Sequence, residues 1–196
     1  MQPSIYLASA SPRRRQLLAQ LGVNCQVQPA AVDETPRENE APAEYVLRLA
    51  IDKARTVAAA RAPAEDPVLA ADTAVVLNGE IFGKPRDRAH ALQMLGQLSG
   101  ATHQVYTAVA VVAGQRCEHA LSCSAVSFRT LDADEAAVYW ETGEPADKAG
   151  AYAIQGLGAV FVASLEGSYS GVMGLPVFET ARLLAAFGYR LLEGNR

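Results

Sequence analysis

Hydrophobic and polar positions follow two different periods along the chain, and together they predict an α/β protein. Continuous apolar runs of strand length, such as 68–77, indicate buried strands. Apolar residues at helical spacing are clearest at 43–61, where one stripe includes Val46, Leu49 and Ala50. Strands are expected at 5–8, 25–29, 68–77, 103–113, 116–130 and 159–165, and helices at about 12–21, 43–61, 88–98, 133–142 and 176–188. This order favours a mixed sheet with flanking helices.

Cap and turn signals mark where several of these elements begin and end. Ser11 followed by Pro12 is typical of a helix N-cap and first helical position. Asp132 with Glu135 matches a capping box. Asp87 is expected to cap the helix at 88–98. Asn78-Gly79 predicts a tight hairpin turn after the strand at 68–77.

Composition narrows the class of protein further. The chain has 196 residues, of which 50% are hydrophobic and 19% charged. Such a chain can bury a core and is unlike a disordered protein. The net charge of −4 and the isoelectric point near 5.4 argue against binding to nucleic acid polymers or to membrane surfaces. With no repeat or linker, we expect a single domain over 1–196, built of two lobes.

Cysteine and histidine spacing gives no sign of a metal or disulfide framework. The three cysteines and three histidines are scattered. No apolar run approaches the roughly 18–20 residues of a membrane span, and the first residues do not resemble a signal peptide. We therefore expect a cytoplasmic protein with reduced thiols and no membrane partner.

Two charged residues break the apolar pattern of their own elements. Asp72 lies within the apolar strand 68–77, and Lys53 lies at the centre of the apolar stripe of helix 43–61. A buried carboxylate is costly unless it is paired or binds a metal, so Asp72 either has a structural partner or serves as a metal ligand or proton acceptor. Lys53 either snorkels to solvent, forms an ion pair or takes part in chemistry.

The segment Ser9-Ala-Ser11-Pro-Arg13-Arg14-Arg15 joins the first strand to the first helix. Hydroxyls, backbone N–H groups and guanidinium groups at a helix N-terminus are suited to holding phosphate. The alternative is a solvated basic turn. The periodicity does not decide which arginine would meet a ligand.

Other nucleotide and hydrolase motifs are missing. Gly83-Lys84-Pro85 fails the P-loop pattern, because the spacing is short and a proline replaces the required Ser or Thr. The glycine-rich stretch 150–158 lacks GxGxxG, and the chain contains no GxSxG.

Seven segments, taken in order, resemble the Maf-like nucleoside triphosphate pyrophosphatases over about residues 4–188. They are SASPRR at 9–14, DETP at 33–36, KA at 53–54, ADT at 71–73, GKP at 83–85, KAGAYAIQG at 148–156 and GSYSGVMGLP at 167–176. The resemblance implies two lobes around a central cleft and hydrolysis of a nucleoside triphosphate to the monophosphate and pyrophosphate. It also implies a divalent metal cofactor, Mg²⁺ or Mn²⁺.

The resemblance also assigns roles to individual residues. It makes Asp72 the proton acceptor and Glu34, Lys53 and Lys84 further catalytic residues. Its substrate-selecting positions fall on Arg13, Thr73 and Gln155, a set similar to the branch that acts on dTTP and UTP. Ser9, Ser11 and Arg14 complete the expected substrate-binding set, and Glu34 with Asp72 is the expected metal-binding pair.

Several alternatives stay open at this point. One is a pyrophosphatase for modified nucleotides such as 7-methyl-GTP, and another is a phosphatase that releases orthophosphate. A third is a non-enzymatic nucleotide-binding regulator of cell division. A homodimer is possible at the level of the family.

Overall fold

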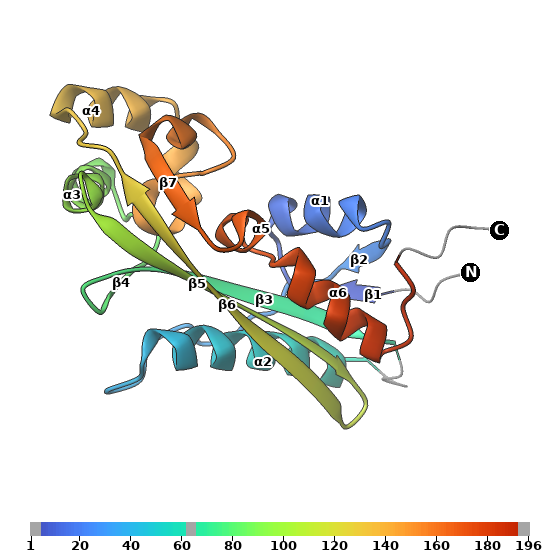
Figure 1. Cartoon of the computed structure of the whole chain (residues 1–196). Helices are drawn as coiled ribbons and strands as arrows, with labels where there is room; N and C mark the ends of the chain where they lie inside the picture. The colour runs from blue at the N-terminus through green and yellow to red at the C-terminus, as the bar shows by residue number, and fades with distance from the viewer. Residues whose placement is uncertain (1–4, 62–65, 192–196) are drawn as a thin grey trace. The chain divides into compact units, whose positions relative to one another are not determined.

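A mixed sheet organises the chain, as Figure 1 shows for the computed structural model. Residues 5–61 and 66–191 are described, and within them the sheet has seven strands in the order β2-β1-β3-β5-β6-β7, with β4 paired to β3. The strands are β1 Ile5–Leu7, β2 Cys25–Val27, β3 Val68–Leu77, β4 Glu80–Phe82, β5 Thr102–Ala113, β6 Arg116–Phe128 and β7 Val162–Glu166. The predicted fold class, a mixed sheet with flanking helices, is confirmed.

The pairing directions show why the sheet is mixed. Strand β1 is parallel to both β2 and β3, whereas β4 is antiparallel to β3 and β7 is antiparallel to β6. The parallel pairs are separated in the chain by helices α1 Pro12–Gln20 and α2 Pro42–Ala59, since parallel strands need long crossovers. The other helices are α3 Arg88–Leu98, α4 Ala133–Glu141, α5 Tyr169–Met173 and α6 Val177–Ala186.

The chain divides into two compact units, each assembled from separate segments. Unit 1 comprises the chain up to Asp72, Thr107–Ser122 and the chain from Gly174, and unit 2 comprises Thr73–Tyr106 and Cys123–Met173. In unit 1, α1 and α2 lie on opposite sides of β1 and β3 (Figure 1). The apolar stripe of α2 is buried, including Val46, Leu49 and Ala50, as the spacing predicted.

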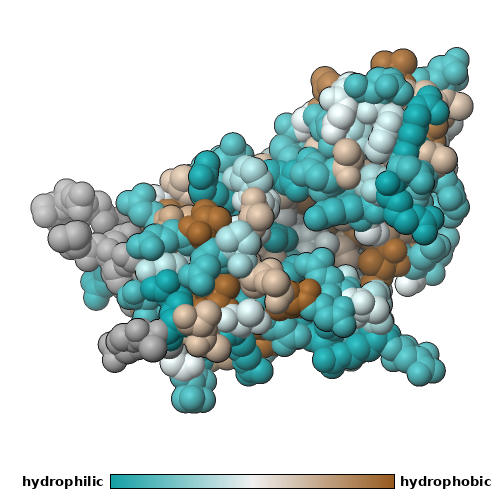
Figure 2. Space-filling view, turned by 180° about the vertical axis from the view of Figure 1, so that it is seen from behind, coloured by the Kyte–Doolittle hydropathy of each residue, from teal (hydrophilic) through white to brown (hydrophobic). Residues whose placement is uncertain are grey.

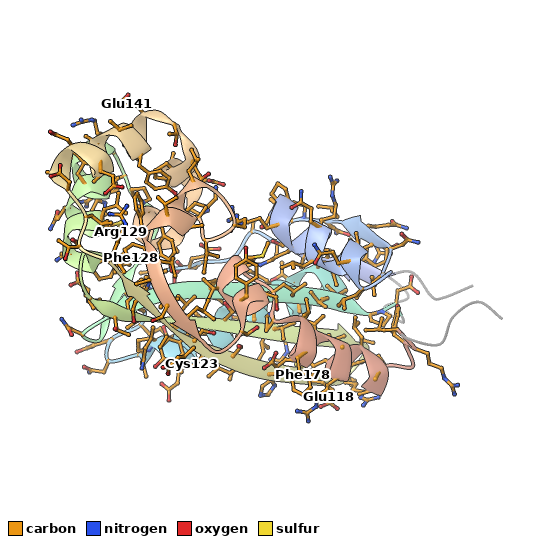
Figure 3. All side chains as sticks on the ribbon, turned by 45° about the horizontal axis from the view of Figure 1, so that its top comes forward. Glu118, Cys123, Phe128, Arg129, Glu141 and Phe178 are labelled. Carbon is orange, nitrogen blue, oxygen red and sulfur yellow. The ribbon has the colours of Figure 1, made fainter. Side chains whose placement is uncertain are left out.

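An aromatic cluster forms the core of unit 2. Phe128, labelled in Figure 3, packs edge-on against His103 and Tyr152, and Tyr139 packs edge-on against Phe161. These rings have centroid separations of 4.8–5.0 Å, within the range that favours edge-to-face contact.

Most predicted caps and turns are present. Asp87 accepts a hydrogen bond from His90 N at 2.8 Å at the start of α3, and Asn78 and Gly79 adopt positive φ angles of 51° and 83° in the β3–β4 hairpin. Pro12 occupies the first turn of α1, but Ser11 caps it without a side-chain hydrogen bond.

The glycine-rich part of the chain departs most from the prediction. The strand expected at 159–165 begins only at Val162, because Leu157–Phe161 forms a 3₁₀ helix. The short helix α5 was not predicted. Local apolar content cannot separate a strand from tight helical turns over so few residues.

The face of the molecule drawn in Figure 2 is mainly polar. Figure 2 shows small apolar patches scattered among polar side chains on one face of the molecule. Isolated exposed apolar residues are normal on folded proteins. Within the described ranges, no helix has both the length and the apolar character needed to cross a membrane.

Candidate active site

The candidate site of unit 1 is centred on a buried lysine between two carboxylates. Lys53 is 8% exposed, and its Nζ lies 2.7 Å from Oδ1 of Asp72 and 2.5 Å from Oε1 of Glu34. Helix α2 supplies the lysine, strand β3 supplies the aspartate, and the loop after β2 supplies the glutamate. The tertiary structure thus brings together three residues that are far apart in the sequence.

The surroundings of Asp72 favour its protonated form more than water does. Its side chain is buried, and burial raises the pKa of Asp72 above its ordinary value, although Lys53 and Arg14 oppose that rise. A carboxylate with a raised pKa is a better proton acceptor near neutral pH. Asp72 is therefore paired with Lys53 and also suited to general base chemistry.

The segment between β1 and α1 forms a compact polar turn in the same unit. Oγ of Ser9 accepts hydrogen bonds from Ser11 N at 3.2 Å and from Arg14 Nη1 at 3.1 Å. Arg14 Nε also donates to Gly174 O at 2.8 Å. Burial lowers the pKa of Arg14, and Asp72 opposes this effect, so the Arg14 guanidinium is electrostatically coupled to the aspartate.

The arginines of this segment have different surroundings. Arg14 is anchored by Ser9 and Gly174, whereas Arg13 is half-buried and Arg15 is exposed. The hydroxyl of Ser11 is not used as a cap for α1. Arg14 is therefore the anchored arginine of this segment, and which arginine meets a ligand stays a prediction.

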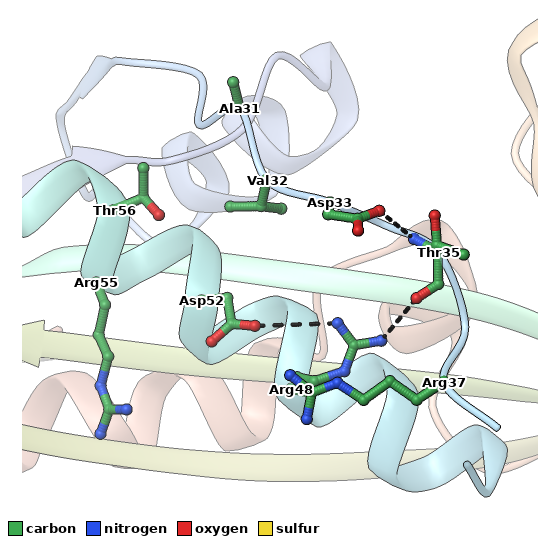
Figure 4. A pocket seen from close by; sticks show the side chains of 9 residues that line it. All are labelled: Ala31, Val32, Asp33, Thr35, Arg37, Arg48, Asp52, Arg55 and Thr56. Carbon is green, nitrogen blue, oxygen red and sulfur yellow. Dashed lines mark hydrogen bonds and ion pairs between the residues drawn. The ribbon is translucent and has the colours of Figure 1, made fainter. Parts of the chain in front are cut away.

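Helix α2 holds the loop that carries Glu34. Tyr45 Oη donates to Glu34 O at 2.9 Å, and Arg48 Nη2 donates to Thr35 O at 3.2 Å, as Figure 4 shows. Arg48 is itself held by Glu40, whose oxygens lie 2.5 and 2.7 Å from Nε and Nη2. Glu34 thus reaches Lys53 from a loop whose carbonyl groups at Glu34 and Thr35 are hydrogen-bonded to α2.

Sequence reasoning did not identify Tyr45 and Arg48 as part of this arrangement. Arg48 lies on the polar face of α2, which is normally a solvated face. The only signal in the sequence is that an acidic residue, Glu40, precedes the helix at a distance that its chain can span.

A groove of about 430 Å³ adjoins the Glu34 loop in unit 1. Its lining comes from the loop and from the polar face of α2, as Figure 4 shows: Ala31, Val32, Asp33, Thr35, Arg37, Arg48, Asp52, Arg55 and Thr56. Glu34, Lys53 and Asp72 are not part of this lining. The groove is therefore distinct from the ion-paired site.

Three of the expected site residues belong to unit 2. Thr73 is half-buried and follows Asp72 in β3, whereas Lys84 and Gln155 are exposed. Gly83 O, next to Lys84, accepts a hydrogen bond from Gly150 N at 3.1 Å. This contact ties the segment of Lys84 to the segment 148–158 that carries Gln155.

The carboxylate pair fits a hard divalent cation. Mg²⁺ is usually held by one or two protein carboxylates together with substrate phosphates and waters. Asp72 and Glu34 supply two such groups around one ammonium. No group of three His, Cys, Asp or Glu side chains suited to a metal occurs among residues 5–61 and 66–191.

The mixed sheet and the carboxylate–lysine–carboxylate arrangement, in which Lys53 and Asp72 are buried, define an α/β protein with a candidate acid–base site. The chain belongs to the family of Maf-like proteins, because the family model matches residues 4–187.

Two curated relatives are closely similar to this chain. The dTTP/UTP pyrophosphatase of Methylococcus capsulatus is 54% identical over 193 residues, covering 97% of this chain and 95% of the relative. The dTTP/UTP pyrophosphatase of Alkalilimnicola ehrlichii is 55% identical over 192 residues, covering 95% and 94%. Among solved structures, the Ham1 protein of Staphylococcus aureus gives a TM-score of 0.48 at 16% identity, covering 64% of this chain and 71% of that chain.

Proposed function

We propose that this protein hydrolyses nucleoside triphosphates, with dTTP and UTP as its substrates, to the monophosphate and pyrophosphate. The observation that carries the proposal is the buried ion pair between Lys53 and Asp72, which Glu34 joins from an exposed loop. Two relatives that share more than half of their residues with this chain bear the name dTTP/UTP pyrophosphatase.

Asp72 is the proposed general base. A water molecule loses its proton to the Asp72 carboxylate as its oxygen attacks the α-phosphorus. The bond from that phosphorus to the bridging oxygen breaks, and pyrophosphate leaves with the bond electrons. The raised pKa of Asp72, which results from burial, favours this proton transfer.

Basic groups offset the negative charge of the phosphate chain. Lys53 is placed to interact with charge that develops near Asp72, and Arg14 and Arg13 supply guanidinium groups at the start of α1. Preorganised cations of this kind typically lower the barrier by several kcal/mol, and losing one costs on the order of a hundredfold in rate. We propose Lys84 as a further cation for the phosphates, and Ser9 and Ser11 as hydroxyl contacts.

Mg²⁺ or Mn²⁺ is the proposed cofactor, held by Asp72 and Glu34. When bound, such an ion neutralises phosphate charge and polarises the reacting groups. The protein's own part is to place the two carboxylates and to keep Lys53 between them.

Gln155 is the proposed reader of the base, together with Thr73 and Arg13. A glutamine side chain offers both a donor and an acceptor, which matches O4 and N3–H of uracil or thymine. Cytosine reverses part of this pattern. A wrong base would leave buried polar atoms unpaired, which gives strong discrimination.

The proposal is tested by assaying a panel of canonical and methylated triphosphates for pyrophosphate, with and without a chelator. We expect release from dTTP and UTP that the chelator abolishes and Mg²⁺ or Mn²⁺ restores. Equal rates on GTP and UTP would contradict the selectivity, and orthophosphate as the first product would indicate a phosphatase. Tight binding without turnover in any metal would indicate a regulator instead.

Two variants locate the chemistry. Asp72→Asn should nearly abolish pyrophosphate release while the circular dichroism spectrum is unchanged. Glu118→Gln, which removes an exposed carboxylate of β6 in the same unit (Figure 3), should retain wild-type turnover. Normal turnover in Asp72→Asn would refute the role of Asp72.

The remaining expectations concern the whole protein in the cell. We propose that residues 1–196 act as one functional domain, that the protein is cytoplasmic, and that it forms a homodimer. Analytical ultracentrifugation tests the dimer, since a single monomer species at micromolar concentration would contradict it.

A further inference from the structure

The turn that carries Gln155 is tied at both ends to one pair of side chains. Residues 153–156 form a tight turn closed by a hydrogen bond from Gly156 N to Ala153 O at 3.1 Å. Before the turn, Ala153 N donates to Tyr139 Oη at 3.1 Å. After the turn, Leu157 N and Gly158 N each donate to the Glu144 carboxylate at 3.0 Å.

The two side chains also bind each other. Tyr139 Oη donates to Glu144 Oε1 at 2.7 Å, so one hydroxyl–carboxylate pair, which we call the Tyr139–Glu144 clamp, spans both ends of the turn. Tyr139 is 4% exposed and packs against Phe161 in the core of unit 2. The clamp is therefore anchored in the aromatic cluster, and Gln155 itself remains exposed.

The glycines of this segment provide independent support for the clamp. A Cβ atom at Gly156 would lie 2.1 Å from Oε2 of Glu144, and one at Gly158 would lie 2.6 Å from Oη of Tyr139. Real Cβ atoms do not approach oxygen so closely, and glycine permits such an approach by the backbone. The pattern Gly-Leu-Gly after Gln155 is thus explained by the clamp.

The charges of the clamp suit a rigid structural role. Burial raises the pKa of Glu144, but the hydrogen bonds from Tyr139, Gly158 and Leu157 outweigh it, so that the pKa lies below its ordinary value. Burial and the neighbouring Glu144 raise the pKa of Tyr139. The pair therefore stays a phenol donating to a carboxylate at neutral pH.

We propose that Tyr139 and Glu144 are positioning residues that set base selectivity by holding the Gln155 turn in one conformation. The inference rests on the proposed function, in which Gln155 reads the base. The Gln155 side chain must pair with a donor and an acceptor of the base at the same time. Small displacements of its backbone would weaken the discrimination between bases, so the turn has to be held in one conformation. Without the clamp, the turn samples other conformations and the wrong base is rejected less well.

The test compares the ratio of kcat/KM for UTP to that for CTP. In Glu144→Gln, the amide nitrogen cannot accept a backbone N–H, and in Tyr139→Phe the hydroxyl is missing while the ring is kept. We expect both variants to lower the ratio about tenfold, with a smaller loss in kcat for UTP. Glu141→Gln, at the exposed end of α4 (Figure 3), is the matched control and should leave the ratio unchanged.

A double variant separates positioning from general destabilisation. If the clamp acts through Gln155, adding Glu144→Gln to Gln155→Ala should lower the ratio no further than Gln155→Ala alone. Additive losses, or an unchanged ratio in the folded clamp variants, would overturn the inference. Should Glu144→Gln fail to fold, Tyr139→Phe alone decides the result.

Failure of the proposed function gives a different result. A wild-type protein that releases no pyrophosphate from UTP would overturn the proposed function, and the selectivity role of the clamp with it. If the wild-type enzyme is active and the clamp variants keep its ratio of kcat/KM for UTP to that for CTP, only the proposed role of the clamp in selectivity is overturned.

Discussion

Lys53 forms ion pairs with two carboxylate side chains at once. Its ammonium lies within 2.7 Å of both Asp72 and Glu34, and Asp72 is buried. Removing one partner of a buried ion pair leaves the other charge uncompensated, which typically costs about 3–5 kcal/mol. The stability of this site therefore depends on that ammonium, and so does its proposed chemistry.

Lys53→Met should reduce activity at least about a hundredfold and destabilise the protein. Burial already raises the pKa of Asp72, and Lys53 opposes that rise, so the folded-state pKa of Asp72 increases further in the variant. A raised folded-state pKa makes stability fall as pH rises. The loss in free energy of unfolding relative to the wild type, measured by urea unfolding, should thus grow as the pH rises above the ordinary pKa of an aspartate, about 4.

Lys53→Arg provides the matched comparison, because it keeps the charge but changes its shape. We expect it to recover most of the stability and little of the activity. A stability deficit in Lys53→Met that does not vary with pH would contradict the ion pair.

His103 makes a second residue-scale prediction, in the core of unit 2. It is 1% exposed, its Nε2 lies 2.9 Å from Tyr152 Oη, and burial lowers its pKa from 6.5 to about 4. Between these two values the unfolded chain binds more protons than the folded protein, so stability rises with pH across this window. The effect amounts to at most about 3 kcal/mol.

Urea unfolding between pH 4 and 7 checks this prediction. His103→Gln cannot take up a proton, so its stability should depend less steeply on pH than that of the wild type. His119→Gln, which replaces an exposed histidine, should keep the wild-type slope. Equal slopes in all three proteins would count against a neutral His103.

At the scale of elements, the Glu34 loop depends on helix α2 for its position. Arg48 bridges Glu40 and Thr35 O, and Tyr45 holds Glu34 O. Ordering a loop residue costs roughly 1–2 kcal/mol of conformational entropy, which these hydrogen bonds offset. These hydrogen bonds thus hold the loop in the conformation in which Glu34 forms its ion pair with Lys53.

Arg48→Lys should lower kcat for UTP about tenfold, because an ammonium cannot form the forked contact with Glu40 and Thr35 at once. Steady-state kinetics measure the effect. Arg55→Lys is the control, since Arg55 lines the same groove (Figure 4) without a hydrogen bond to the described part of the loop. Similar losses in both variants would argue against positioning by Arg48.

At the scale of the whole molecule, the boundary between the two units falls inside β3. Asp72 belongs to unit 1 and Thr73 to unit 2, so the proposed base and a proposed selectivity residue are adjacent in one strand. Neither unit is a continuous segment of chain. The expected site residues are therefore distributed over both units, although they occupy short motifs in the sequence.

Ligand binding should stabilise the whole protein in a metal-dependent way. α,β-Methylene-UTP cannot be hydrolysed at the α–β bridge, and at a hundred times its Kd a ligand adds about 2.7 kcal/mol. For a chain of this size that raises Tm by about 5–10 °C. Differential scanning fluorimetry should show this shift with Mg²⁺ and a much smaller one with chelator or with the corresponding GTP analogue.

Equal shifts in Tm with and without metal would contradict the proposal that Asp72 and Glu34 bind a divalent cation together with the substrate. Equal shifts with the uridine and guanosine analogues would contradict selectivity at the level of binding.

Much of the fold and part of the site followed from local patterns. Strand β3 was predicted at its observed limits, and the caps and turns at Asp87 and Asn78-Gly79 are present. Asp72 and Lys53 were singled out from the sequence because each interrupts an otherwise apolar periodic element, although whether Lys53 reaches solvent was left open. Glu34, Lys84 and Gln155 were found only through family resemblance, since a polar residue in a polar loop has no distinguishing pattern.

The sequence by itself determined most of the helices and strands and singled out Asp72 and Lys53 as charges within apolar patterns, because periodicity and capping are properties of neighbouring residues. Only the tertiary structure decided the partners. It showed that Asp72 pairs with Lys53, that Arg14 is the anchored arginine, and that Tyr139 and Glu144 hold the Gln155 turn. These contacts join residues distant in sequence or on polar faces, and such pairings depend on how the elements pack.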